Sequence, residues 1–169
     1  DPSLTTMLWA TYHGGSGNDA GFGVQVASNG ELYVTGGTAS ANLPTAGVPF
    51  AAAFSGIVDG FIARYSPTGD ALISATFLGT TSFDQSYFVQ LDTQDNVYVV
   101  GQTAGAFPVS QGVYADPTGS QFIQKFSADL SASIWSTRIG STGNENISPS
   151  AFLVSDCGQI YFSGWGGST

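Results

Sequence analysis

One short pattern occurs three times in the chain and sets the strongest limit on its fold. Each copy has a polar residue, an aliphatic residue, a tyrosine, two further residues and a glycine, and the copies span residues 31–36, 96–101 and 159–164. The tyrosines, Tyr33, Tyr98 and Tyr161, are 65 and 63 positions apart. A recurrence at this interval is typical of a fold that uses one supersecondary unit several times.

The rest of each unit aligns once the three tyrosines are matched. Every unit then supplies short runs rich in Val, Ile, Phe and Tyr, bounded by Gly, Asn, Asp or Pro. The aligned runs are 8–14, 73–79 and 134–140; 22–26, 87–91 and 151–154; and 61–66 and 122–127. Together with the tyrosine runs, they predict four short strands for each complete unit and an all-β fold.

Two kinds of connection join these runs. Residues 28–30 and 66–70 contain Asn-Gly and Pro-Thr-Gly, which predict tight turns with glycine in the left-handed region. The other connections are long, residues 37–59 and 102–121, and both carry apolar fragments. We expect these long loops to fold back onto the sheets, because loops of this length are usually functional or specially packed.

The tyrosine run predicts a sheet that is covered on both faces. Leu32 and Val34 lie on one face of this strand, and Tyr33 and Thr35 lie on the other. Both faces are mostly apolar in every copy, and four-stranded sheets packed face to face around an axis meet that requirement. The pattern therefore predicts a β-propeller. A two-sheet sandwich is the alternative, but it does not explain a repeat of 61 to 65 residues.

Several linked motifs carry a resemblance to a known family. They are Gly14-Gly-Ser-Gly-Asn-Asp19, Val24-Gln-Val-Ala-Ser-Asn-Gly30, Leu32-Tyr-Val-Thr-Gly36, Leu43-Pro44 and Asp59-Gly-Phe-Ile-Ala-Arg64. Together they resemble the bacterial SBBP β-propeller repeat over nearly the whole chain. The resemblance implies that the run at Val24 is the innermost strand, followed by the tyrosine run, the run at Phe61 and an outer strand at Ile73. It also implies a large protein that is secreted or attached to the bacterial cell surface.

The alignment divides one propeller segment, residues 1–169, into blades. Residues 1–14 are expected to form the outer strand of a preceding blade, 15–79 and 80–140 two complete blades, and 141–169 a partial blade. The resulting eleven strands cannot close a ring, and open sheet edges invite further pairing. We therefore expect a piece of a larger protein whose remaining blades complete the propeller. Closure by assembly with further copies of the chain is the alternative.

The charge balance limits the partners. Charged residues make up 9% of the chain, the net charge is −9, and only three residues are basic. Such a surface repels phosphate backbones and anionic lipids, so we expect no nucleic-acid binding. No apolar run approaches the ~20 residues of a spanning helix, so we expect no membrane insertion. Surface glycans, proteins and divalent cations are compatible with this charge.

The sequence shows no catalytic constellation. His13 is the only histidine, and no spacing in the sequence pairs it with a nucleophile or a carboxylate. We therefore expect a non-catalytic scaffold or an adhesive recognition module of an extracellular protein. The alternatives are part of a propeller enzyme, such as a lyase or a glycan-degrading enzyme, with catalytic residues on other blades, and a lectin-like carbohydrate-binding module.

Three tryptophans and one cysteine are further candidates. Trp165 stands between two glycines and is the candidate for ligand contact, whereas Trp9 and Trp135 lie near outer strands and are predicted to pack within the blades. The single cysteine, Cys157, has no internal disulfide partner, so it is either a free thiol or paired with a cysteine outside this segment.

Two basic residues, Arg64 and Lys125, occupy the same aligned position in the third strand of their units. An ion pair with a carboxylate of the same blade is the preferred interpretation. An anion-binding clamp is the alternative.

An acidic residue recurs five positions after each outer-strand glycine. These acids are Asp19, Asp84 and Glu145. The preferred interpretation is structural, with each carboxylate accepting hydrogen bonds from backbone N–H groups of its own turn. The alternative is a calcium ion at each turn, but calcium usually takes more than one carboxylate. No cofactor other than calcium is suggested.

Overall fold

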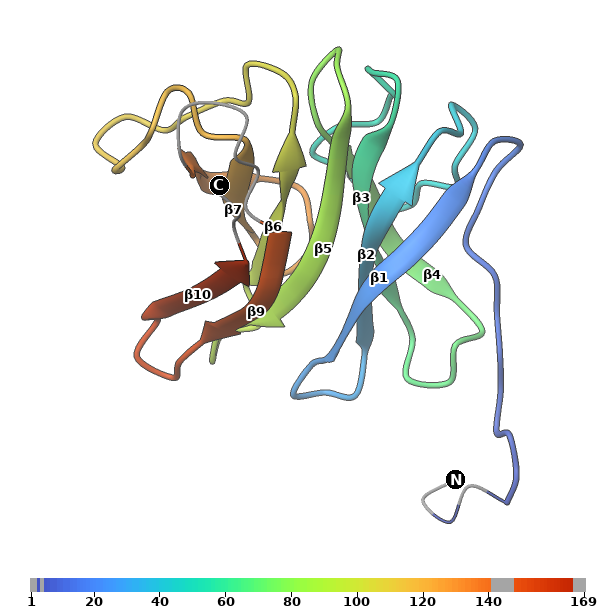
Figure 1. Cartoon of the computed structure of the whole chain (residues 1–169). Coiled ribbons are helices and arrows are strands. Elements are labelled where there is room, and N and C mark those ends of the chain that lie inside the picture. The colour runs from blue at the N-terminus through green and yellow to red at the C-terminus, as the bar shows by residue number, and fades with distance from the viewer. Residues whose placement is uncertain (1–2, 4, 141–147, 166–169) are drawn as a thin grey trace.

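The computed structural model describes residue 3 and residues 5–140 and 148–165, which form an all-β fold of ten strands (Figure 1). No helix occurs among these residues, and hence none that could span a membrane. The strands are β1 (Asp19–Val26), β2 (Leu32–Thr38), β3 (Asp59–Tyr65), β4 (Leu72–Leu78), β5 (Asp84–Leu91), β6 (Val97–Thr103), β7 (Gln121–Phe126), β8 (Ser133–Ile139), β9 (Ser148–Val154) and β10 (Ile160–Trp165).

Two four-stranded antiparallel sheets and one hairpin follow the repeat. The first sheet has the order β1-β2-β3-β4, the second β5-β6-β7-β8, and β9 pairs with β10. The registers agree, because Tyr33 lies opposite Gln25 and Arg64 while Tyr98 lies opposite Gln90 and Lys125. The predicted all-β class, the antiparallel four-stranded sheets and the order of the strands within each sheet are confirmed.

The predicted strand at residues 8–14 is not formed. This segment is mostly exposed, and Figure 1 shows it running as a single extended chain beside the first sheet. A strand requires a hydrogen-bonded neighbour, and no strand of the described residues pairs with this segment. The described chain therefore has ten strands instead of the expected eleven.

The tight turns have the predicted backbone conformations. Gly30 and Gly69 have φ angles of 86° and 71°. In the second sheet the corresponding turns use Asp95, with φ of 59°, and Leu130, with φ of 64°. The carboxylate of Asp95 accepts hydrogen bonds from the N–H and the hydroxyl of Ser28 in the first sheet, at 3.2 and 2.7 Å. This turn therefore links the two sheets.

The long loops fold back onto the sheets, as predicted. Ala46 O of the first loop accepts a hydrogen bond from Ala75 N on β4, and Ser110 N of the second loop donates one to Ser136 O on β8. Each loop also buries one apolar side chain, Leu43 or Phe107. The loops therefore cover the β4 and β8 edges, which would otherwise expose unpaired backbone groups.

The glycine that ends the tyrosine pattern is explained by steric constraints, because a side chain at this position would clash. A Cβ atom on Gly36 would lie 1.9 Å from Ala20 O and 2.8 Å from the ring of Phe61. A Cβ atom on Gly101 would lie 2.3 Å from Gln85 O and 2.4 Å from the ring of Phe122. In both sheets the first strand has a β-bulge at this point. The position therefore requires a residue without a side chain.

The core lies between successive sheets. Tyr33 and Ile62 of the first sheet belong to one buried cluster with Val89, Val99 and Phe122 of the second. The aligned face of the second sheet, with Tyr98, Val100 and Ile123, belongs to another cluster with Phe152 and Val154 of the hairpin. The tyrosine face of one sheet thus packs against the opposite face of the next sheet at both junctions.

Candidate functional site

The acidic turns are held by hydrogen bonds. Asp19 Oδ2 accepts from Gly15 N and Ser40 Oγ, both at 2.8 Å, and its Oδ1 accepts from Thr38 Oγ1 at 2.5 Å. Partial burial acts to raise the pKa of Asp19, but these hydrogen bonds outweigh it and leave the pKa below its ordinary value.

The second acidic turn repeats part of this arrangement. Asp84 is fully buried, and its Oδ2 accepts hydrogen bonds from Thr80 N at 2.6 Å and Thr80 Oγ1 at 2.7 Å. At both turns a backbone N–H of the turn donates to the carboxylate, as the structural interpretation predicts. The third acid, Glu145, lies outside the described residues.

A further acid, Asp59, lies beside Asp84. Asp59 begins β3 of the first sheet, is fully buried, and accepts hydrogen bonds at its Oδ2 from Ser55 N at 2.7 Å and Ser55 Oγ at 3.0 Å. A Cβ atom built on Gly79 would lie 3.1 Å from both Asp59 Oδ1 and Asp84 Oδ2, so the two carboxyl groups flank the same point. No group of three or more His, Cys, Asp or Glu side chains suited to a metal occurs among the described residues.

His13 packs against two aromatic residues of the first sheet. Its Nδ1 lies 2.7 Å from the hydroxyl of Tyr65, and its ring centroid lies 5.1 Å from that of Phe61. Burial lowers the pKa of His13, and the nearby carboxylate of Asp19 opposes this shift. These contacts are those of a packed side chain at the entry to β1, because a phenol and an aromatic ring are its close neighbours.

The basic residues of the third strands form the predicted ion pairs. Arg64 Nη2 lies 2.5 Å from Glu31 Oε2, and Lys125 Nζ lies 2.8 Å from Asp92 Oδ2. Each cation also lies over the ring of the tyrosine in its own sheet, at 5.8 Å for Arg64 and 4.7 Å for Lys125. Both charges are thus paired with an acid of their own sheet and are not arranged as an anion clamp.

The three tryptophans and the cysteine lie in four different places. Trp165 is the last residue of β10, and 72% of its surface is exposed. Trp135 makes an edge contact with Tyr98 at 6.0 Å, and Trp9 lies against Gly69 in the β3–β4 turn. Cys157 is an exposed free thiol in the β9–β10 turn. The structure therefore does not bring Trp165 together with the other candidates.

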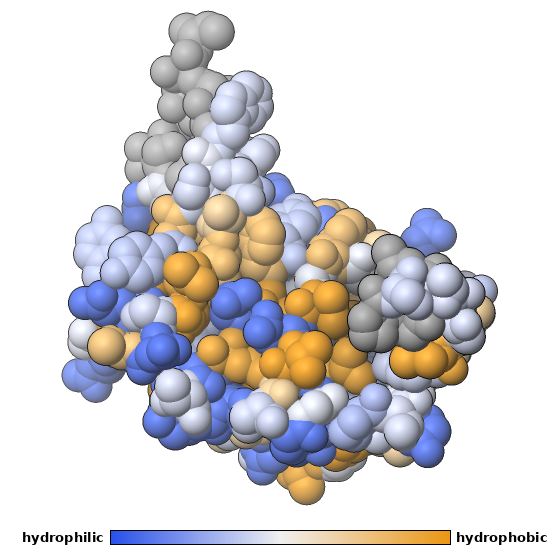
Figure 2. Space-filling model, turned by 90° about the horizontal axis from the view of Figure 1, so that it is seen from below, coloured by the Kyte–Doolittle hydropathy of each residue, from blue (hydrophilic) through white to orange (hydrophobic). Residues whose placement is uncertain are grey.

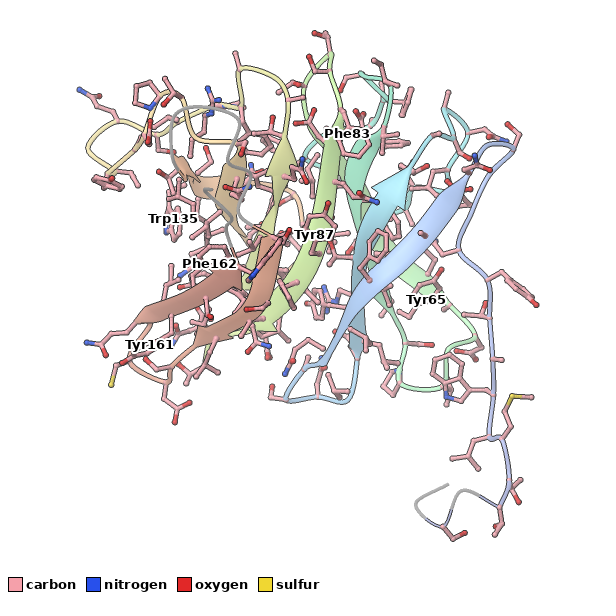
Figure 3. The ribbon with its side chains drawn as sticks, viewed as in Figure 1. Tyr65, Phe83, Tyr87, Trp135, Tyr161 and Phe162 are labelled. Atoms are coloured by element: carbon pink, nitrogen blue, oxygen red, sulfur yellow. The ribbon has the colours of Figure 1, made fainter. Side chains whose placement is uncertain are left out.

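One cavity of about 350 Å³ lies between β1, the β5–β6 pair and the start of β9. It is lined by Phe22, Tyr87, Phe88, Gln102, Ser148 and Pro149. The rings of Phe22 and Tyr87 are 5.6 Å apart, and the Tyr87 hydroxyl lies 3.1 Å from Gln102 Oε1. Figure 3 shows Tyr87 on β5 close to the terminal hairpin. Sequence reasoning missed this site because its residues differ between the units.

The units share apolar faces that are buried at the junctions between successive sheets, but are exposed on the first sheet and on the hairpin. Val89 is 3% exposed, but the aligned Val24 of the first sheet is 62% exposed. Tyr98 is 4% exposed, but the aligned Tyr161 of the hairpin is 55% exposed. Figure 2 shows apolar side chains gathered across the middle of one side of the molecule.

No protein-family model matches this sequence, and its comparison with curated proteins gives no match. The function is therefore inferred from the repeat and from the contacts that it makes. Of the residues predicted as sites, Asp19 and Asp84 occupy equivalent turns, and Trp165 stands apart from both. The residues that sequence reasoning missed are Asp59 and the lining of the cavity beside Tyr87.

Proposed function

We propose that this chain is a segment of a β-propeller that acts as a non-catalytic scaffold or recognition module of a larger extracellular protein. The observation that carries the proposal is the pair of uncovered faces. The Val24 face and the Tyr161 face are the two kinds of face that meet at the junctions inside the chain. Each end therefore suits a further sheet of the same kind.

The two internal junctions supply the pattern for such packing. Tyr33 and Tyr98 are buried by the sheet that follows each of them, and Val89 and Phe152, which are aligned with Val24, are buried by the sheet before them. Between the first two sheets, Thr35 Oγ1 also hydrogen bonds to Ser86 Oγ at 2.7 Å. Because the contact is heterologous, it can be repeated around a ring until the ring closes.

The segment before β1 supports the same arrangement. His13 lies against Phe61, and its aligned residue Leu78 shares a buried cluster with Phe122, which is aligned with Phe61. The Gly15 N–H donates to Asp19 as the Thr80 N–H donates to Asp84. Residues 13–15 thus contact the first sheet as the end of β4 contacts the second, which is the place that an outer strand of a preceding blade would take.

The uncovered Val24 face also has room for an occupant. A groove of about 390 Å³ lies between residues 9–13 and the face that carries Val24, Leu32 and Val34. Burying such a face contributes about 25 cal/mol for each Å² of apolar surface removed from water. The resemblance to the SBBP repeat supports the further proposal that the whole protein is secreted or attached to the bacterial cell surface.

Two single substitutions test the packing of the ends. Val24→Asp places a charge on one uncovered face, and Tyr161→Asp places a charge on the other. Because both side chains are largely exposed in the isolated chain, each variant should keep its fold, which circular dichroism can check. Sedimentation velocity should show concentration-dependent association of the unchanged chain and monomers of either variant alone.

An equimolar mixture of the two variants tests whether the two faces bind each other. Each variant keeps one intact face, so the mixture should form a one-to-one dimer and nothing larger. An unchanged chain that stays monomeric at several hundred micromolar, together with a mixture that also stays monomeric, would reject the proposal that these faces accept further sheets.

A further inference from the structure

Two carboxylate oxygens are buried without partners at the junction of the first and second sheets. Asp59 and Asp84 are both fully buried, and Oδ1 of each has no hydrogen-bond partner. The Oδ2 atom of each is already engaged by its own loop. Burying a charged oxygen without a partner is costly, so the pair requires a compensating charge.

The protein's basic side chains do not supply that charge. The chain has three basic residues. Arg64 pairs with Glu31 and Lys125 pairs with Asp92. Arg138 donates from Nε and Nη2 to Gly119 O, at 2.9 and 2.6 Å. The partner of these two oxygens is therefore a bound cation, a proton or an ordered water, and only the cation also neutralises both carboxylates.

Backbone oxygens complete the surroundings of Asp59. A Cβ atom built on Gly56 would lie 2.2 Å from Ser82 O, 2.7 Å from Thr80 O and 2.8 Å from Asp59 Oδ1, so these three oxygens surround one point. Thr80 O accepts one hydrogen bond from Ser55 Oγ and Ser82 O accepts one from Ile57 N, which leaves each carbonyl a second lone pair. Carboxylate and carbonyl oxygens are the ligands of hard cations.

We propose that Asp59 and Asp84 together bind one hard divalent cation, with calcium as the best match, and that this cation joins the first sheet to the second. Calcium accepts an irregular set of carboxylate and carbonyl oxygens, whereas magnesium demands near-ideal octahedral geometry. The site does not depend on the proposed propeller, because both acids lie within the described junction. It differs from a calcium ion at every acidic turn, because Asp19 has hydrogen bonds on both oxygens.

The ionisation of Asp59 agrees with an uncompensated pair. Burial raises the pKa of Asp59, and the Asp84 carboxylate raises it further, against hydrogen bonds from Ser55 and the Gly56 N–H that lower it. A bound cation would reverse this shift. A proton held by the pair is the competing explanation, and it makes the opposite prediction for chelation.

Thermal unfolding at pH 7 separates the two explanations. The full chain is first treated with EDTA, which is then removed, and calcium chloride is added in steps. With calcium a hundredfold above its Kd, the midpoint should rise by about 5–10 °C. Magnesium at the same concentration should raise it less, and isothermal titration calorimetry should give close to one calcium per chain.

Matched variants assign the effect to this pair. Asp59→Asn and Asp84→Asn should each abolish the calcium response, and Asp19→Asn should retain it. A midpoint of the unchanged chain that calcium leaves unaltered rules out the cation. If Asp59→Asn then raises the midpoint at pH 7, a held proton explains the pair. If either variant fails to fold, calorimetry on the unchanged chain decides alone, since absence of calcium binding rejects the site.

Discussion

Replacing Gly101 with alanine is expected to destabilise the protein by about 3 kcal/mol, at the upper end of the usual range for overpacking. The new Cβ atom would lie 2.3 Å from the backbone oxygen of Gln85 and 2.4 Å from the ring of Phe122. A backbone oxygen in a paired strand cannot move away as a flexible side chain can. The free energy of unfolding, measured by urea denaturation, should therefore fall sharply.

Gly21 provides the matched control for this change. A Cβ atom there would meet only Val34 Cγ1 at 3.6 Å, which is an ordinary contact distance. Gly21→Ala should therefore alter the free energy of unfolding by no more than about 0.5 kcal/mol, the usual range for surface substitutions. Equal effects of the two substitutions would show that close packing does not explain the glycine at position 101.

Phe122→Ala is expected to cost about 3–5 kcal/mol, the range for removing a large buried aromatic side chain. Phe122 is fully buried, and its ring stacks on that of Phe107 with centroids 4.1 Å apart. The substitution would leave a cavity in the cluster that joins the first two sheets. Urea denaturation again measures the loss.

The control for this cavity is Phe22→Ala, because half of the Phe22 surface is exposed on β1. Its cost should be about 1 kcal/mol or less, since less apolar surface leaves a buried environment. If Phe122→Ala were as mild as Phe22→Ala, the junction between the sheets would not be the main core of the chain.

The strands were predictable because each unit repeats the same local chemistry. Tyr33 and Tyr98 lie at matching places in matching sheets, and the buried Leu43 and Phe107 belong to the aligned loop fragments. The segment at residues 8–14 has a strand-like sequence as well, but pairing depends on a neighbour that local pattern cannot supply. Sequence alone therefore overestimates the number of strands by this one segment.

The candidate sites were predictable only where they lie within one unit. Arg64 and Lys125 are aligned, and both ion pairs form within their own sheets. Asp59 is different, because it lies beside Asp84 of the next sheet and the aligned residue of the second unit is Ser120. A pair made by two units across a junction leaves no repeated signal in the sequence.

Disulfide trapping tests the central claim, that the ends of the chain accept further sheets through the same contacts as its interior. Thr35 and Ser86, whose hydroxyl oxygens are 2.7 Å apart at the first junction, are aligned with Ser163 and Gly21. Ser163→Cys and Gly21→Cys are made in separate chains that also carry Cys157→Ser, and the two are mixed under mild oxidation. Ser163→Cys mixed with Asn29→Cys, which lies in the turn at the other end of β1, serves as the mismatched control. The account predicts a covalent dimer in the first mixture, with a bond between positions 163 and 21 shown by peptide mass spectrometry, and none in the control. Equal trapping in both mixtures, or none in either, would contradict it.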